Sequence, residues 1–185
     1  MAKQQPKNQP HKSQSAKSAA KPKADERLVD KYFRELTEVY PKPLDRGLLM
    51  IGALIILLGF TGLLWAFPFP HLGFLGKYNG FINWASFLMA VAGYFYYRLS
   101  PVLCYLVIFI LFGFAYIITL LQGWQNTGGP SLMVISDVEI VLGAIGFYTV
   151  SLRNRRTTQS EALNLLFVSV AFYLGKLLKK IGAQY

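Results

Sequence analysis

The feature that most constrains this chain is a long apolar stretch at residues 47–67, which reads GLLMIGALIILLGFTGLLWAF and contains no charged side chain. A helix rises about 1.5 Å per residue, so this stretch would span roughly 30 Å, the thickness of the hydrocarbon core of a bilayer. A soluble domain rarely holds so long an uninterrupted apolar run. The sequence therefore predicts an integral membrane protein, with this stretch as its first crossing.

Three further apolar stretches predict more crossings, and 54% of the 185 residues are hydrophobic. The stretches are separated by segments that contain Pro, Gly or a basic residue, which interrupt helices or mark membrane boundaries. We expect an all-α, polytopic membrane helix bundle whose four transmembrane helices lie at residues 47–67, 81–97, 102–121 and 132–152.

The N-terminal region changes character near residue 25. Residues 1–24 are mainly Lys, Gln, Ser, Ala and Pro, which cannot bury enough apolar surface to fold, so we expect a disordered basic tail. Residues 25–40 carry apolar side chains at helical spacing, and Pro41 and Pro43 would end this segment. We expect an amphipathic helix, capped by Asp25, on the membrane surface or against the bundle. It opens a membrane domain that runs from 25 to 185.

The basic residues predict how the protein is oriented. The first 46 residues hold 11 of the 19 Lys and Arg residues, and Arg98 and the basic run at 153–156 would lie on the same side. Because positive charge stays in the cytoplasm, both termini should be cytoplasmic. A bacterial inner membrane is favoured, with an endoplasmic-reticulum-type membrane second. We interpret the basic tail as a contact for anionic lipid headgroups of the bilayer, not for nucleic acid. A partner for the tail is the alternative.

The last apolar stretch, residues 162–180, differs from the four crossings. It contains Lys176 and ends in Lys179 and Lys180, and a fifth crossing would carry these charges to the outer side. We therefore expect an interfacial helix at the cytoplasmic face, whose lysines extend toward the headgroups.

Small residues recur on two of the predicted crossings. On a membrane helix such residues let a neighbouring helix approach closely, and this use is commoner than a ligand site. We expect close helix packing at Gly52, Gly59, Gly62, Ala85, Ala90 and Ala92.

Acidic residues within a membrane helix are costly, which makes Asp137 and Glu139 candidate functional residues. They stand two positions apart and face different sides of the helix, so they do not form a paired carboxylate site by themselves. The structural interpretation is that Ser136 and Glu139 form a capping box at the helix start. His71 could join the two carboxylates in a metal site on the outer side, although the spacing does not demand it.

Four short motifs resemble a known family of small membrane proteins. Residues 62–70 read GLLWAFPFP, similar to the family pattern GLLWA-x-P-x-P at the end of its first crossing. Residues 83–85 (NWA) and 96–101 (YYRLSP) resemble its N-W-A and Y-x-R-L-S-P motifs, and 163–185 resembles its Leu-rich final helix and L-G-x-x-Y ending. Over residues 30–185 the chain thus resembles the 2-hydroxy fatty acid dioxygenase-like family, formerly a domain of unknown function.

The resemblance implies a helical membrane fold and lipid oxidation that rests on iron held by histidines. The places of those histidines fall near Glu38, Gly47 and Val150 in this chain, and none of these residues is a histidine. The family's E-G-K-x-P segment is also changed, to RNRRT at residues 153–157. The resemblance therefore implies the fold and membrane setting of the family, with its iron site lost.

We interpret the chain as a divergent, catalytically inactive relative of lipid dioxygenases that binds lipid or a membrane protein partner in the bundle cavity. No cofactor is expected, or iron if the family activity survives. One alternative is an active iron-dependent fatty acid oxygenase with a rebuilt site, drawn from Glu38, His71, Asp137 and Glu139. Another is a small transporter or membrane assembly factor in which Asp137 and Glu139 face a polar cavity.

Overall fold

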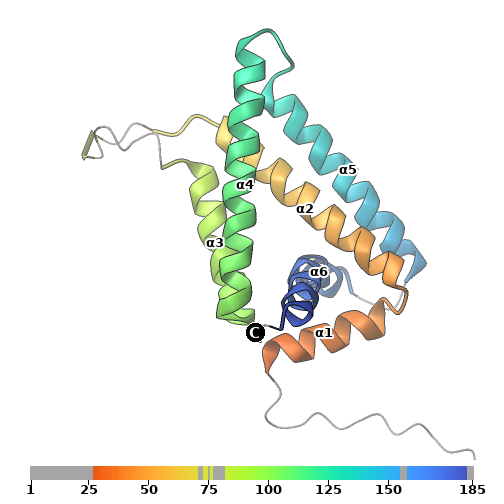
Figure 1. The fold of residues 1–185 in the computed structure, drawn as a ribbon. Helices are drawn as coiled ribbons and strands as arrows, with labels where there is room; N and C mark the ends of the chain where they lie inside the picture. Colours follow the sequence, from red (N-terminus) through yellow and green to blue (C-terminus); the bar gives the residue numbers. More distant parts are fainter. Residues whose placement is uncertain (1–26, 71–72, 75, 77–81, 155–157, 183–185) are drawn as a thin grey trace, which may run out of the picture.

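The structure, a computed structural model, describes residues 27–70, 73–74, 76, 82–154 and 158–182. Within these ranges 86% of the residues are helical and no strand occurs, which confirms the expected all-α fold. Six helices follow one another along the chain (Figure 1): α1 (Leu28–Val39), α2 (Pro43–Ala66), α3 (Trp84–Leu99), α4 (Pro101–Asn126), α5 (Leu132–Arg153) and α6 (Gln159–Lys180).

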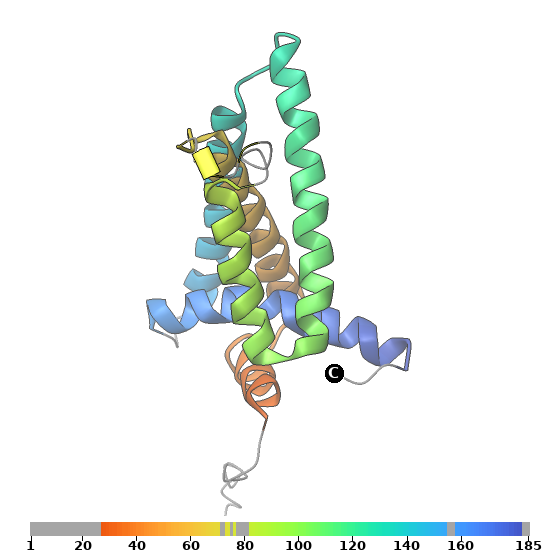
Figure 2. The same cartoon turned by 90° about the vertical axis from the view of Figure 1, so that its left-hand side faces the viewer.

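The helices form two pairs that lean toward each other. α3 stands beside α4, and α2 packs along α5 in the opposite chain direction (Figure 1). The two pairs meet near the end where α4 leads into α5, and they diverge toward the other end. α6 lies in the opening between them and runs crosswise to α3 and α4, with α1 beneath it (Figure 2).

Four helices are long and apolar enough to cross a membrane, but they are not the four that the sequence predicts. They are α2, α4, α5 and α6, whereas α3 has 16 residues and is not among them. α3 is shorter because Asn83 caps its start, with its Oδ1 accepting from the Ser86 amide at 3.0 Å, and because Pro101 opens the next helix. These helices support a multi-pass membrane protein.

The apolar side chains of α6 pack mainly against protein. In its most apolar part 56% of the residues are buried inside the bundle, against 17% for α5. The Tyr96 hydroxyl of α3 donates to the Phe167 carbonyl oxygen at 2.9 Å, and the Tyr173 hydroxyl of α6 donates to the Pro43 carbonyl oxygen at 3.1 Å. The crosswise direction is that expected of an interfacial helix at 162–180.

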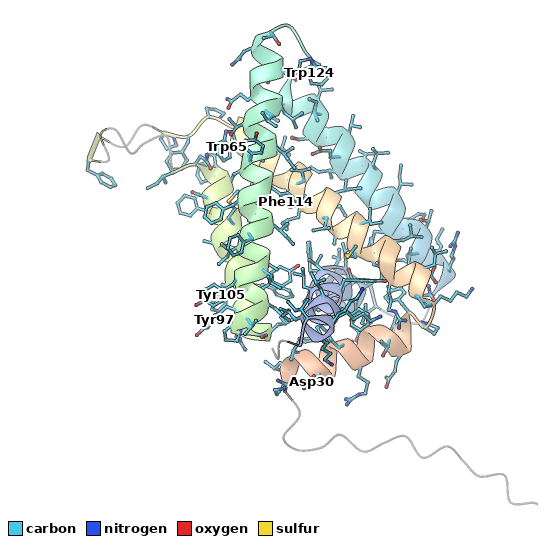
Figure 3. The ribbon with its side chains drawn as sticks, in the orientation of Figure 1. Asp30, Trp65, Tyr97, Tyr105, Phe114 and Trp124 are labelled. Atoms are coloured by element: carbon cyan, nitrogen blue, oxygen red, sulfur yellow. The ribbon has the colours of Figure 1, made fainter. Side chains whose placement is uncertain are left out.

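Aromatic side chains mark both ends of the bundle. Figure 3 shows Trp124 at the far end of α4, and Tyr97 and Tyr105 at the opposite end, where α3 turns into α4. All three side chains are exposed. Trp and Tyr are enriched at the two membrane–water interfaces, so this distribution fits a membrane whose normal follows α4.

The amphipathic segment is confirmed over Leu28–Val39 and lies against the bundle. Val29 and Leu36 are buried, and the ring of Phe33 meets the edge of Phe172 on α6 at 5.3 Å between centroids. Arg27 stands at the capping position of α1, and its side chain accepts no hydrogen bond from the backbone of the first turn. Asp25, the expected cap, lies outside the described residues. The basic tail at residues 1–24 lies outside them as well.

Two expected helix ends are displaced. Pro43 does not end the amphipathic helix but begins α2, because proline has no N–H to lose in the first turn of a helix. Residues 122–126, which lie beyond the end of the crossing predicted at 102–121, continue α4 as far as Asn126. No proline interrupts this segment, and the helix ends just before Gly128, whose φ is +99°.

The capping box predicted at Ser136 and Glu139 is wrong. Ser131 is the capping residue of α5, and its Oγ accepts from the Val134 amide at 3.4 Å. Ser136 lies inside the helix and is buried against α2. A capping box does occur at the start of α6, between Thr158 and Glu161. The motif alone does not distinguish a helix start from a helix interior.

The α2–α5 contact depends on small residues, as expected. A methyl group built on Gly59 would lie 2.8 Å from the Ser136 carbonyl oxygen, and one on Gly143 would lie 2.5 Å from Ile56 Cγ1. The two helices can approach this closely only where a Cβ atom is absent. The expectation also holds for Gly52, Gly62 and Ala85, which are buried, and for the half-buried Ala92, which packs against the core; it fails for Ala90, which is exposed.

We expect Gly59→Ala and Gly143→Ala to destabilise the protein by about 1–3 kcal/mol, because the added methyl group forces α2 and α5 apart. The free energy of unfolding would be measured by titrating detergent-purified protein with SDS and following helix content. Gly113→Ala is the matched control, because nothing lies within 4 Å of its built Cβ. Equal stability of all three variants would contradict a packing role for Gly59 and Gly143.

Candidate functional site

The structure places the predicted site residues far apart. Glu38 is exposed on α1, with its Oε1 3.9 Å from Arg34 Nε, at the end of the bundle that holds α6. Asp137 and Glu139 lie in the first turns of α5, at the opposite end (Figure 1). His71 lies outside the described residues. The described candidates for a rebuilt oxygenase site therefore do not converge.

Asp137 and Glu139 face different sides of α5, as their spacing predicts. Asp137 is exposed, whereas Glu139 is half-buried beside α2. A Cβ atom built on Gly59 of α2 would lie 3.1 Å from the Cβ atom of Glu139. Within the described ranges neither carboxylate takes part in a hydrogen bond or an ion pair. Neither lines any of the three clefts described below.

The residues present do not fit the iron site that the resemblance implies. Val150 is fully buried, and Gly47 supplies no side chain and lies beside the Tyr173 hydroxyl. In the part of the chain that the structure describes, no three His, Cys, Asp or Glu side chains are grouped so that they could hold a metal ion. We therefore assign no chemical step to a metal at these positions.

A buried carboxylate that was not among the predicted site residues lies in the first turn of α2. This residue, Asp45, is 2% exposed. Its Oδ2 accepts from Asn154 Nδ2 at 3.2 Å, and its Oδ1 lies 3.6 Å from Arg153 Nη1. The Asn154 amide also donates to the Val150 carbonyl oxygen at 3.1 Å. This polar contact, the Asp45–Asn154 lock, ties the start of α2 to the end of α5.

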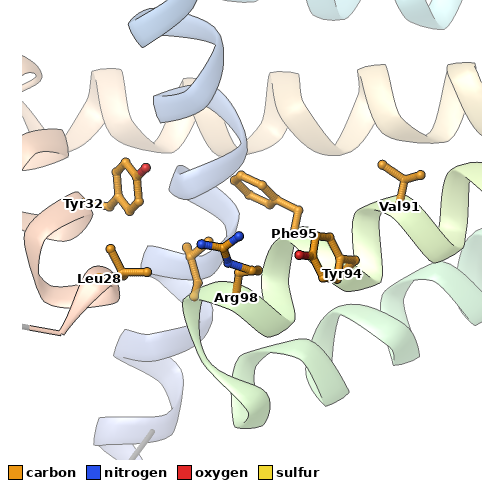
Figure 4. A pocket seen from close by; sticks show the side chains of 7 residues that line it. Leu28, Tyr32, Val91, Tyr94, Phe95 and Arg98 are labelled. Atoms are coloured by element: carbon orange, nitrogen blue, oxygen red, sulfur yellow. The ribbon is translucent and has the colours of Figure 1, made fainter.

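An open cleft lies between α1 and α3. Figure 4 shows its lining: the guanidinium of Arg98 extends from α3 toward α1, and the hydroxyl of Tyr94 turns to the same side. Leu28 and Tyr32 of α1 form the opposite wall. We call this the outer cleft, and its volume is about 340 Å³. Its surface combines apolar side chains with one cation and two phenol groups.

A second, more apolar cleft adjoins the outer cleft, because Val91 and Phe95 line both. This inner cleft has a volume of about 250 Å³ and lies between α2, α3 and α6. Its other lining residues are Leu57, Leu88, Ala92, Tyr96, Asn164 and Phe167. The hydroxyl of Tyr96 is already used in its bond to the backbone of α6, so the walls are mainly hydrocarbon. We call the two clefts together the groove: the outer cleft contains its cation and phenol groups, and the lining of the inner cleft is mainly apolar.

Arg98 is the chemically distinctive residue of this groove. Its side chain is exposed in the last turn of α3, and none of the residues described forms a hydrogen bond or an ion pair with its guanidinium. An arginine fork that protein groups do not occupy can bind a carboxylate or a phosphate in two parallel hydrogen bonds. The groove can therefore hold an anionic group in its outer cleft.

One sequence signal could have drawn attention to Arg98. Between Arg46 and Asp137 the chain has only two charged residues, Lys77 and Arg98. Arg98 contributes to the predicted orientation of the chain, but it was not among the predicted binding residues. Comparison of the chain with protein-family models, curated proteins and solved structures gives no match. The geometry of the groove and the short motifs are therefore the basis for a functional proposal.

The Asp45–Asn154 lock gives a stability prediction. We expect Asp45→Ala to lower the free energy of unfolding by about 1–3 kcal/mol, because it removes the hydrogen bond between α2 and the half-buried Asn154 amide and the carboxylate that faces Arg153. Asp137→Ala, which removes an exposed carboxylate without a hydrogen-bonded partner among the described residues, should change stability by less than about 0.5 kcal/mol. SDS titration of both variants would measure the difference. A similar loss in the two variants would show that the lock contributes nothing specific.

Proposed function

We propose that this integral membrane protein binds an anionic single-chain lipid, such as a fatty acid, in the groove formed by the outer and inner clefts. The proposal rests on the guanidinium of Arg98, which lines the outer cleft beside apolar side chains. No described residue forms a hydrogen bond or an ion pair with this guanidinium. The acidic group of the lipid would lie at Arg98, and its hydrocarbon chain would extend between α2, α3 and α6.

The outer cleft suits the polar end of such a lipid. Arg98 supplies N–H donors in a planar fork that matches a carboxylate. Tyr32 and Tyr94 line the same cleft and offer hydroxyl groups for a second polar substituent near the acid.

The inner cleft suits the hydrocarbon end. Its walls are apolar apart from Asn164 and the engaged Tyr96 hydroxyl, so a chain there replaces lipid or water at little cost. The combined size of the two clefts falls within the range of about 300–1,000 Å³ that is usual for small-molecule sites. The groove therefore has room for part of an acyl chain, with the remainder in the bilayer.

The motif resemblance agrees with this ligand class. The family it points to acts on 2-hydroxy fatty acids, which carry a carboxylate, a neighbouring hydroxyl and a long chain. The places of the family's iron ligands hold Glu38, Gly47 and Val150 in this chain, and these do not converge on a metal site. We propose that the protein is a divergent, catalytically inactive relative of the lipid dioxygenases, which binds lipid and lacks the oxidation step.

The proposed orientation puts the outer cleft at the cytoplasmic surface. Arg98 shares a cleft with α1, Lys176 and Lys179 share another with it, and Arg153 lies 3.6 Å from Asp45 in the first turn of α2, which follows α1. The positive-inside rule assigns the end of the bundle that holds α1 to the cytoplasm, and the loop between α4 and α5 to the opposite side. A lipid of the cytoplasmic leaflet would then meet Arg98 at headgroup depth.

Labelling of single cysteines in a Cys104→Ser protein tests this orientation. In sealed vesicles we expect Thr158→Cys and Lys180→Cys to react with a membrane-impermeant reagent only from the cytoplasmic side, because α6 lies crosswise. Thr127→Cys, in the loop between α4 and α5, should react only from the other side. Reaction of Lys180→Cys together with Thr127→Cys would show that α6 crosses the membrane.

Binding of a photoreactive fatty acid to detergent-purified protein tests the proposed ligand. We expect Arg98→Gln to weaken binding by about tenfold to a hundredfold, because it removes a charge-assisted hydrogen-bonding partner. Ala92→Trp should reduce binding by filling the inner cleft, with the fold checked by helix content. Lys31→Gln, which removes one exposed charge outside both clefts, is the matched control.

Equal binding to the Arg98→Gln and Lys31→Gln proteins would contradict the proposed position of the acidic group.

The iron content of the same preparations distinguishes a catalytically inactive relative of the dioxygenases from an active one. We expect no stoichiometric iron by elemental mass spectrometry, even after iron is supplied under reducing conditions. Near-stoichiometric iron would contradict the proposal that the protein is catalytically inactive and would favour an iron-dependent oxygenase.

A further inference from the structure

A third cleft, separate from the groove, lies between α1 and α6. We call it the α1–α6 cleft, and its volume is about 430 Å³. α1 contributes Asp30, Phe33, Arg34 and Thr37, which lie on one face of the helix at intervals of three or four residues. α6 contributes Phe172, Lys176 and Lys179, which share a face in the same way. None of these residues lines the outer or the inner cleft.

Positive charge dominates the α1–α6 cleft. It has three cations, Arg34, Lys176 and Lys179, and one carboxylate, Asp30. The carboxylate is already paired, because its Oδ2 lies 2.8 Å from Arg27 Nε. The Arg34–Glu38 pair is long, at 3.9 Å, and its carboxylate partner is 70% exposed, so solvent screens much of it. The lining residues thus carry more positive than negative charge, and Lys176 is the cation among them with no hydrogen bond or ion pair to a described residue.

One of these cations, Lys176, lies over an aromatic floor. The rings of Phe33 and Phe172 meet edge to face at 5.3 Å, and Phe172 is only 8% exposed. The ammonium of Lys176 lies 4.6 Å from the centroid of Phe172 and 5.6 Å from that of Tyr173. These contacts hold the ammonium in place while its N–H groups remain available, since no hydrogen bond or ion pair of Lys176 occurs among the residues described.

We propose that the α1–α6 cleft binds the phosphate of a phosphomonoester lipid, such as phosphatidic acid, from the leaflet that surrounds α1 and α6. Three cations around one cavity match a compact group that carries close to two negative charges at neutral pH. α1 runs crosswise to α4 in Figure 1 and α6 does so in Figure 2, both at the same end of the bundle, which is where headgroups lie if the membrane normal follows α4. The apolar floor would contact the glycerol part of the lipid.

Native mass spectrometry of the detergent-purified full chain with dioctanoyl phosphatidic acid tests this site. We expect phosphatidic acid to bind at least tenfold more tightly than phosphatidylcholine with the same chains. Lys176→Gln with Lys179→Gln should remove most of this preference. The matched control is Lys31→Gln with Lys180→Gln, which removes the same charge from exposed positions outside the cleft and should change affinity by less than threefold. Lys179→Gln alone, which leaves the aromatic contacts of Lys176 intact, should give a partial loss.

Three results would overturn the proposal. An equal loss in the control pair would mean that phosphatidic acid responds to overall charge and not to this cleft. No difference between the two lipids would exclude selective phosphate recognition. Displacement of the lipid by glycerol 3-phosphate at equal concentration would show that the cleft binds a free phosphate and not a lipid. Arg98→Gln should leave phosphatidic acid binding unchanged, so the outcome does not depend on the fatty acid groove.

Discussion

The fold depends on the burial of α6 across the opening between the two helix pairs. More than half of its most apolar part is enclosed by protein, and two tyrosine hydroxyls bond it to α2 and α3. Without this helix the diverging ends of the pairs would leave a gap lined by apolar side chains. Because α6 fills the gap only in part, it leaves clefts on its two sides. Asn164 and Phe167 line the inner cleft, and Phe172 and Lys176 line the α1–α6 cleft.

The α2–α5 pair provides the rigid side on which this arrangement rests. Glycines bring the two helices together along their length, and the Asp45–Asn154 lock joins them at the end nearest α6. A buried carboxylate is costly unless it is hydrogen-bonded, so the lock strongly favours one register of α2 against α5. Tyr173 then fixes α6 to the carbonyl group of Pro43, two residues before Asp45. The floor of the α1–α6 cleft is thereby positioned by a chain of contacts that begins between α2 and α5.

The sequence predicts the helices well because the relevant signal is local. Apolar runs, prolines and polar turns place all six helices, and the errors are confined to their ends, as with Pro43 and residues 122–126. The lysines of the last stretch predict an interfacial helix and not a crossing, but the sequence does not predict that most of the apolar side chains of α6 are buried in the bundle, because composition cannot distinguish apolar side chains that face lipid from those that face protein. It also misses Asp45, whose partner Asn154 is 109 residues away in the chain. Arg98 was visible as an isolated charge, but only the structure shows that it lies at a cleft and has no partner among the described residues.

We propose that the protein has lost lipid oxidation but keeps lipid binding. The positions of the family's iron ligands and the residues of the groove lie in different parts of the bundle, which is why one can be lost without the other. The regions near Gly47 and Val150, where the resemblance would place iron ligands, are occupied by protein contacts. Val150 is fully buried and its carbonyl group accepts from Asn154, while Gly47 lies beside the Tyr173 hydroxyl. A metal site there would have to displace the lock that holds α2 to α5. Arg98 and the inner cleft lie on α3 and the facing side of α6, away from that lock, so a structural contact can replace the iron site while the lipid groove stays open.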